Sequence, residues 1–207
     1  MRAALLVYEG TEPIDLAPFG VLSMARRVVP QVSMYVVAQE AGPVRLANGL
    51  VVMADHGHGD APPADVLIIT GGPGWDRESR NSATIEFIRR FSAHSSVAAV
   101  CTGGMILAAT GLLDGKPATT KKEVTGAERS PLEILAERHP AVRAIDARLV
   151  DCGAVLTGGG VTLCIDMTLH LLARFCGEEA ARETARILEY SAALAANESR
   201  GPLVRAA

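Results

Sequence analysis

The sequence lacks an excess of charge of either sign: 20 Lys and Arg residues stand against 23 Asp and Glu residues, for a formal net charge of −3. Proteins that hold nucleic acid or anionic membranes neutralise phosphates with clustered Lys and Arg. The balance argues against nucleic-acid and membrane partners and leaves a small-molecule substrate as the expected partner.

Long apolar runs are absent as well. The longest, around residues 66–69 and 97–100, fall far short of the roughly 20 residues that cross a membrane. Glu9 interrupts the N-terminal run before the apolar region of a secretory signal is complete. With 49% hydrophobic residues, the chain is apolar enough for one compact domain. We expect a single soluble, cytoplasmic domain over residues 1–207.

Cysteines and histidines with the spacing of a metal site are missing too. The four cysteines are far apart and form no CxxC pair or Cys/His cluster: Cys101, Cys152, Cys164 and Cys176. His56 and His58 have a His-x-His spacing but no third ligand nearby, and the other three histidines fit a surface, a turn and a packed helix. We expect no metal, no cofactor and no histidine base for a Cys-His protease mechanism.

What the sequence does contain is a regular alternation of buried strands and helices. Apolar runs predict strands at 2–8, 32–38, 66–70 and 97–100, with two short strands within 148–157. Helical spacing predicts helices at 15–28, 84–91, 162–175 and 178–193, and residues after Asn197 are expected to fray. This order predicts an α/β fold: a single-domain sandwich with a mainly parallel sheet, helices on both faces, and a site beyond the carboxyl ends of the strands.

Residues 44–53 interrupt this alternation. Asn48-Gly49 lies at their centre, and this pair accepts the positive φ angles of a type I′ turn. We expect a hairpin appended to the main sheet.

The most informative stretch, residues 96–110, is a buried strand that leads into Cys101 and then directly into a helix. Ala99 and Gly103, two positions before and after, complete the pattern of a nucleophile elbow, whose sharp turn crowds those positions. The turn exposes the sulfur at a helix N-terminus, which is expected to lower the pKa of the thiol. The alternative is a buried cysteine that ends a strand. The other three cysteines have no such turn and are expected to be structural.

A second glycine-rich turn, residues 71–74, also follows a strand. Its N–H groups, together with that of Thr102, are expected to face the same cleft as donors to developing negative charge. The turn is not GxGxxG and lacks the ending of a P-loop, so nucleotide binding is not favoured. A tight loop without a catalytic part is an equal alternative.

Asp15 lies in the loop after the first strand, at the predicted start of a helix. Capping that helix is the simplest role for it. A carboxylate beyond the carboxyl end of a strand next to the elbow strand is also placed to reach the thiol and transfer protons. Glu12 is a second, less well placed candidate.

Together these segments resemble the ThiJ/PfpI superfamily, whose members have a class I glutamine amidotransferase-like, flavodoxin-like α/β fold. The resemblance covers nearly the whole chain and is carried by residues 100–120, Ile14-Asp-Leu-Ala-Pro18 and Ile69-Thr-Gly-Gly-Pro-Gly74. Residues 155–170 and Leu188-Glu-Tyr190 are similar to the isonitrile hydratase branch and to the ligand-binding domains of AraC-type regulators.

The hydratase resemblance implies addition of water to the terminal carbon of an organic isocyanide, giving an N-substituted formamide without a metal or organic cofactor. It implies that Cys101 is the nucleophile and Asp15 the proton donor, through a thioimidate that water then hydrolyses. Thr102 would hold substrate or water, and Gly72 and Gly103 would shape the pocket from the backbone.

The chain departs from the branch after Ala-Thr-Thr120, where relatives commonly have a histidine and an aromatic residue and this chain has Lys121 and Lys122. A histidine-assisted peptidase or amidase is therefore not expected. Lys121 would pair with a carboxylate near the pocket or, the favoured interpretation, be solvated. Trp75, the single tryptophan, would wall a hydrophobic pocket, pack at the surface or belong to a dimer interface.

Two other functions stay open. One is a cysteine-dependent stress protein, either a redox sensor or a glyoxalase-like enzyme for small dicarbonyls, since a low-pKa cysteine beside a carboxylate also oxidises readily. The other is a stand-alone sensing domain for a small molecule. The regulator relatives continue into a helix-turn-helix module whereas this chain reaches Ala207 without one, which favours an enzyme. The resemblance also implies a homodimer.

Overall fold

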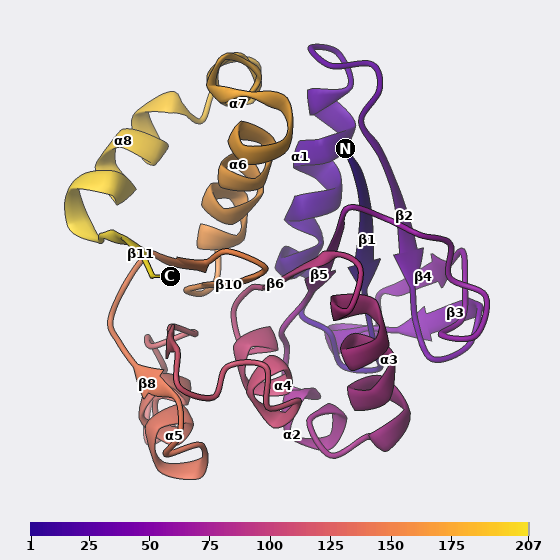
Figure 1. Ribbon diagram of the computed structural model, residues 1–207, viewed down its shortest axis with the longest axis vertical. Coiled ribbons are helices and arrows are strands. Elements are labelled where there is room, and N and C mark those ends of the chain that lie inside the picture. Colours follow the sequence, from indigo (N-terminus) through magenta and orange to yellow (C-terminus); the bar gives the residue numbers. More distant parts are fainter. Residues whose placement is uncertain (207) are drawn as a thin grey trace.

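Five neighbouring parallel strands make up most of a seven-stranded sheet in the computed structural model, which describes residues 1–206 (Figure 1). They are β1 (Arg2–Leu6), β2 (Ser33–Val37), β5 (Val66–Ile69), β6 (Ser96–Ala99) and β10 (Val155–Gly158). The order across the sheet is β11-β9-β10-β6-β5-β1-β2. At one edge β9 (Leu149–Cys152) pairs antiparallel with β10, and β11 (Leu203–Arg205) pairs parallel with β9. The predicted α/β fold with a mainly parallel sheet is confirmed.

Helices cover both faces of the sheet, because the central strands bury side chains on both sides. Along β1, Ala3 and Leu5 belong to one hydrophobic cluster, and Ala4 and Leu6 belong to the other. The first cluster includes residues of α1 (Ala17–Ala25), α6 (Leu163–Cys176) and α7 (Glu178–Ile187). The second includes residues of α3 (Ser82–Ser92) and α4 (Gly103–Ala109). Figure 1 shows these two groups of helices apart from each other.

Smaller elements surround this core. The predicted hairpin is confirmed as β3 (Gly42–Arg45) and β4 (Val51–Ala54), a separate two-stranded sheet. Its loop is a three-residue 3-10 turn, Ala47–Gly49, in place of the two-residue type I′ turn, although Asn48 and Gly49 do have positive φ. The short elements α2 (Trp75–Glu78), β7 (Pro117–Ala118), α5 (Pro131–Arg138) and β8 (Arg143–Ala144) have no predicted counterpart.

The C-terminal region differs from the prediction in two ways. The single helix expected over 178–193 is two helices, α7 and α8 (Ser191–Arg200), because Glu189 takes a positive φ of 56° between them. The expected fraying after Asn197 is wrong, since α8 continues past it and β11 joins the sheet. Long-range contacts hold this region: Tyr190 and Asn197 both donate hydrogen bonds to the buried carboxylate of Asp166.

Candidate active site

The elbow forms as predicted, with Cys101 between the end of β6 and the start of α4. Its φ of 51° is rare for a residue with a side chain and requires support from the surrounding structure. The Cys101 N–H donates to the carbonyl of Gly159 at 3.2 Å, and the Thr120 hydroxyl donates to the carbonyl of Cys101 at 2.6 Å. The elbow is thus fixed from β10 on one side and from the segment after β7 on the other.

Two glycines allow the elbow to lie directly against the end of β5. A Cβ atom at Gly103 would lie 2.4 Å from the carbonyl oxygen of Ile69. A Cβ atom at Gly71 would lie 2.5 Å from the Thr102 nitrogen and 2.9 Å from Asp15 Oδ2. Both distances are shorter than real Cβ contacts, so glycine is required at both positions. The close approach brings the loops after β1, β5 and β6 together.

Asp15 is fully buried within this junction, on the 3-10 turn η1 (Pro13–Leu16) that follows β1. Its Oδ2 accepts a hydrogen bond of 2.7 Å from the Gly71 N–H. It does not cap a helix: neither η1 nor α1 has a side-chain cap. Oδ1 has no hydrogen-bond partner among the described residues. One oxygen therefore holds the carboxyl group in place, and the other is available to accept a hydrogen bond or a proton.

The pKa of Asp15 is raised from 3.8 to about 7. Burial is the main cause, and the negative charge of nearby Glu12 adds to it. The Gly71 N–H and the Cys101 thiol act in the opposite direction by hydrogen bonding to the carboxylate. Near neutral pH the carboxyl group is therefore present in both forms, which suits a group that accepts and returns a proton.

The pKa of the Cys101 thiol differs from the expectation. Burial, and then the negative charge of Asp15, raise it to about 12, and outweigh the hydrogen bonds from Thr102 and the positive charge of Lys121. The predicted lowering is wrong because the sulfur is only 3% exposed, and desolvation of a thiolate costs more than the short helix α4 returns. Cys101 is therefore present mainly as a thiol at neutral pH in this structure.

The expected N–H donors of the glycine-rich turn are not free in this structure. Its N–H groups, and that of Gly103, donate to protein acceptors: Gly71 to Asp15 Oδ2, Gly72 to Thr102 Oγ1 at 2.8 Å, Gly74 to Gly10 O at 3.2 Å, and Gly103 to Val100 O at 2.9 Å. The Thr102 hydroxyl is likewise engaged by the Gly72 N–H. The Thr102 N–H, by contrast, faces the Cys101 sulfur and lowers the pKa of that thiol. Gly72, Gly103 and the Thr102 hydroxyl therefore shape the site through the backbone and its contacts.

Cys101 and Thr102 line a cavity of about 570 Å³ that is mainly apolar. Its apolar wall comes from Ile14, Pro73, Trp75, Val124, Pro131, Ile134 and Val161. The indole ring of Trp75 is held by the Arg138 guanidinium, 5.4 Å from the ring centroid, and Arg138 is also paired with Asp76 at 2.6 Å. Glu12, the second acidic candidate, lines the cavity, whereas the fully buried Asp15 does not line it and contacts the Cys101 thiol.

Several residues of this cavity escaped the sequence reasoning. Pro131 and Ile134 come from α5, which covers the cavity and was not predicted. A signal was present, since Pro131 follows Ser130 at a helix start and Leu132 and Leu135 have helical spacing. The hydroxyl of Thr120 fixes the elbow. Thr120 lies within residues 100–120, which carry the family resemblance, but the sequence alone suggests no role for it.

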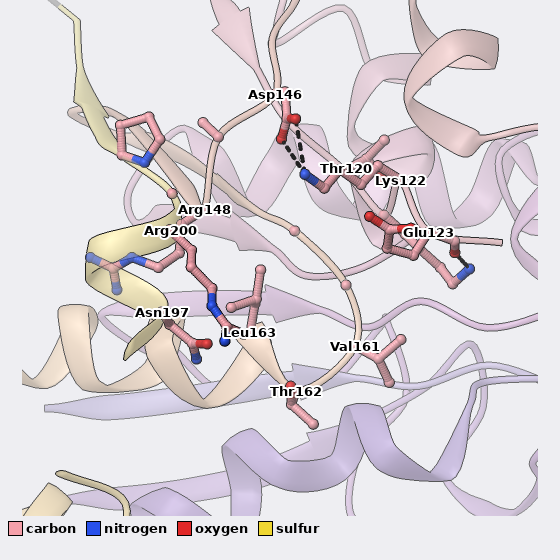
Figure 2. Close-up of a pocket in the computed structure, with 16 residues that line it drawn as sticks. Thr120, Lys122, Glu123, Asp146, Arg148, Val161, Thr162, Leu163, Asn197 and Arg200 are labelled. Atoms are coloured by element: carbon pink, nitrogen blue, oxygen red, sulfur yellow. Dashed lines mark hydrogen bonds and ion pairs between the residues drawn. The ribbon is translucent and has the colours of Figure 1, made fainter. Parts of the chain in front are cut away.

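A second cavity of about 390 Å³ adjoins the first and shares Lys121 and Val161 with it. Figure 2 shows Lys122 directed at both carboxylate oxygens of Asp146, with Arg148, Asn197 and Arg200 on another side of the cavity. The Lys122–Asp146 distance is 2.9 Å, and Arg148 is paired with Asp166 at 3.0 Å. Two of the four cations at this cavity, Lys122 and Arg148, are therefore compensated, whereas Lys121 and Arg200 form no ion pair among the described residues.

The histidines lie away from Cys101. His56 is 3.7 Å from Asp60, His58 stacks on Phe87, and His170 is 2.8 Å from Asp151. Across residues 1–206 there is no group of three His, Cys, Asp or Glu side chains placed to hold a metal ion. In the same residues no helix is both long and apolar enough to cross a membrane.

Comparisons with known proteins agree with this geometry. The sequence profile of the DJ-1/PfpI family matches residues 1–174. Isonitrile hydratase of Pseudomonas putida is 32% identical over 197 residues, which make up 93% of this chain and 80% of that protein. The HTH-type transcriptional regulator GbdR of Pseudomonas aeruginosa is 34% identical over 139 residues, 64% of this chain and 34% of the regulator. A solved THiJ/PfpI family protein from Pseudomonas syringae has a TM-score of 0.79 at 27% identity, over 92% of this chain and 75% of that one.

Proposed function

The chain belongs to the DJ-1/PfpI family, and from that premise we propose that it is an enzyme that adds water to an organic isocyanide to give an N-substituted formamide. The observation that carries the proposal is the pairing of an elbow thiol with a buried carboxyl group, one oxygen of which has no hydrogen-bond partner among the described residues. The similarity to isonitrile hydratase over 93% of the chain supports the same reaction.

The first step joins the thiol to the terminal carbon of the isocyanide. Cys101 gives its proton to the Asp15 carboxylate, and its sulfur forms a bond to the carbon. Asp15 then delivers the proton to that same carbon, which leaves a thioimidate, R–N=CH–S–Cys101. A carboxyl group with a pKa of about 7 suits this step because it can hold the proton briefly at neutral pH.

The second step hydrolyses the thioimidate. Water adds to the carbon of the C=N bond while Asp15 takes one of its protons. The C–S bond then breaks, one proton ends on nitrogen and one returns to sulfur, and the products are R–NH–CHO and free Cys101. The atoms balance without an oxidant, a reductant or a cofactor.

The shape of the cavity supports an apolar substituent on the isocyanide. Trp75, Ile134 and Val161 offer aromatic and aliphatic surface to the group R, whereas the reacting end needs only the space beside Cys101. Trp75 belongs in this proposal as a wall of the pocket, held in place by Arg138. The hydroxyl of Thr102 keeps the glycine turn against the elbow.

The test is formamide production from a panel of alkyl and aryl isocyanides, followed by chromatography. We expect turnover by the natural protein, none by Cys101→Ala, and a large loss in Asp15→Asn. Cys176→Ala is the matched control, because Cys176 lies on α6 away from the cavity and its loss leaves the reaction intact. No turnover by a folded protein whose Cys101 still reacts with a thiol probe would overturn the proposal for those substrates.

A ligand-sensing domain is the second candidate, supported by the similarity to GbdR. It is favoured if isocyanides bind at the cavity without being converted. The homodimer stays a prediction, and light scattering of the purified protein would test it.

A further inference from the structure

The proposed reaction needs negative charge on the Cys101 sulfur, and three acidic residues lie around it: Asp15 beside the thiol, and Glu12 and Glu128 in the cavity wall. Asp15 from η1 raises the pKa of Cys101. Cys101 in turn raises the pKa of Tyr8, after β1, and of Cys164, on α6, so both lie close enough to interact with it. None of these neighbours is a cation. The Thr102 N–H gives a hydrogen bond, and the remaining favourable group is Lys121.

Two cations line the cavity with Cys101, namely Lys121 and Arg129. Arg129 is paired with Glu137, so its charge is compensated. The Lys121 ammonium group donates to the backbone carbonyl of Glu123, which carries no formal charge, and no carboxylate of residues 1–206 forms an ion pair with it. The favoured expectation of a solvated Lys121 is therefore incomplete: the side chain is half-buried and lines the cavity without a carboxylate partner among residues 1–206.

The backbone places Lys121 next to the elbow. Lys121 directly follows Thr120, whose hydroxyl is bonded to the Cys101 carbonyl. A Cβ atom at Gly160 would lie 2.8 Å from both Cβ and Cγ of Lys121 and 3.3 Å from the Cys101 sulfur. The lysine stem and the sulfur therefore pack against the same glycine, and any larger residue there would displace one of them.

We propose that Lys121 is a positioning residue, whose uncompensated ammonium group stabilises the Cys101 thiolate formed when the thiol gives its proton to the Asp15 carboxylate. The inference rests on Cys101 being the nucleophile of the proposed function, but not on the identity of the substrate. The lowering of the Cys101 pKa by Lys121 agrees with it.

The chain supplies its own control in the next residue. Lys122 has the same charge and the same length, but it is paired with Asp146 at 2.9 Å and lines only the second cavity. A general effect of lysine charge would act through both residues, whereas the proposed effect acts through Lys121 alone.

The test is the pH dependence of Cys101 alkylation by iodoacetamide, measured by mass spectrometry of the peptide that contains Cys101. Lys121→Met keeps an unbranched stem against Gly160 and removes the charge. We expect its alkylation rate to fall about threefold to tenfold at each pH between about 7 and about 9, where a lysine side chain carries its charge. Lys121→Arg is expected to stay within about twofold of the natural protein, and Lys122→Met to be unchanged.

Three results would overturn the inference: an unchanged alkylation rate in Lys121→Met between about pH 7 and about pH 9, an equal fall in Lys121→Arg, or an equal fall in Lys122→Met. Lys121→Gln serves as the neutral variant if Lys121→Met does not fold. Alkylation needs no isocyanide, so a protein that shows the Lys121 effect but makes no formamide would refute the proposed function and leave this inference standing.

Discussion

Two aspartates are buried to the same extent, yet the molecule gives them opposite surroundings. Asp15 is fully buried and accepts one hydrogen bond besides its contact with the Cys101 thiol, from the backbone N–H of Gly71, and its Oδ1 has no hydrogen-bond partner among residues 1–206. Asp166, on α6, is 1% exposed and receives three, from Arg148 at 3.0 Å, Tyr190 at 2.9 Å and Asn197 at 3.1 Å. The number of donors, and not the depth of burial, separates a carboxylate that is free to react from one that holds the structure together.

The two regions also differ in where their donors come from. The donor to Asp15 is a backbone N–H, fixed by glycine at position 71. The donors to Asp166 are side chains from the loop before β9, from the α7–α8 junction and from α8. The candidate active site is therefore built from strand ends that the sheet positions, and the Asp166 cluster from side chains that tie the C-terminal helix to the core.

The largest effect is expected from a substitution of Asp15. Asp15→Asn keeps an oxygen that can accept from the Gly71 N–H, but it has no proton to transfer between sulfur and carbon. We expect kcat for formamide formation to fall by about 100-fold to 10,000-fold, the usual contribution of a positioned general acid or base. Steady-state kinetics on the natural protein and the variant would measure it. A fall of less than about threefold would remove Asp15 from the proton path.

The matched change at the other aspartate is expected to act on stability. Asp166→Asn leaves the buried Arg148 without its main counter-charge and presents amide hydrogens to donors. We expect the free energy of unfolding to fall by about 3–5 kcal/mol. Denaturant unfolding would measure the loss. Glu198→Gln is the control, because Glu198 is exposed and lies 3.6 Å from Arg148, so a loss below about 1 kcal/mol is expected there.

The burial of Asp15 also predicts how the stability of the protein depends on pH. The pKa of Asp15 is about 7 in the folded protein and 3.8 in the unfolded reference, so the folded protein binds more protons between these values. The contribution of the Asp15 carboxyl group to the free energy of unfolding is fully present below pH 3.8 and is lost as the pH rises through about 7. We expect Asp15→Asn to be more stable than the natural protein at about pH 8, by up to about 4 kcal/mol.

Unfolding curves of both proteins at about pH 5 and about pH 8 would test this expectation. The stability advantage of Asp15→Asn is expected to grow with pH. An advantage that stays constant, or a variant that is less stable at both pH values, would show that the carboxyl group is not strained by burial. Together with the loss of activity, a gain in stability would identify Asp15 as a residue kept for chemistry.

The sequence was sufficient for the elbow and the sheet because both depend on local patterns. Buried runs of four or five apolar residues predict parallel strands, and Ala99, Cys101 and Gly103 lie close together in the chain. The pKa of Cys101 could not be predicted in this way. It depends on burial by loops from four strand ends and on the charge of Asp15, which is 86 positions away in sequence.

The structure of the C-terminal region could not be predicted from local sequence patterns either. The Ala-rich sequence from Glu178 onward keeps a helical spacing across the α7–α8 break, so no local signal marks Glu189. The strand β11 has only three residues, Leu203–Arg205, and forms because β9 offers it a free edge. Tertiary contacts decide both features.

The smallest expected effect concerns the support of the elbow itself. Thr120→Val is nearly the same in shape and removes the hydroxyl that donates to the Cys101 carbonyl at 2.6 Å. We expect a loss of about 1–2 kcal/mol in the free energy of unfolding, because a buried carbonyl loses this partner. Thr110→Val is a suitable control, since its buried hydroxyl also donates to a backbone carbonyl, that of Leu107, away from the site. Thr110→Val also leaves the Leu112 N–H without its partner at 3.2 Å, so it is expected to lose at least as much stability by denaturant unfolding. Only Thr120→Val is expected to slow alkylation of Cys101, because of these two hydroxyls only that of Thr120 supports the positive φ of Cys101.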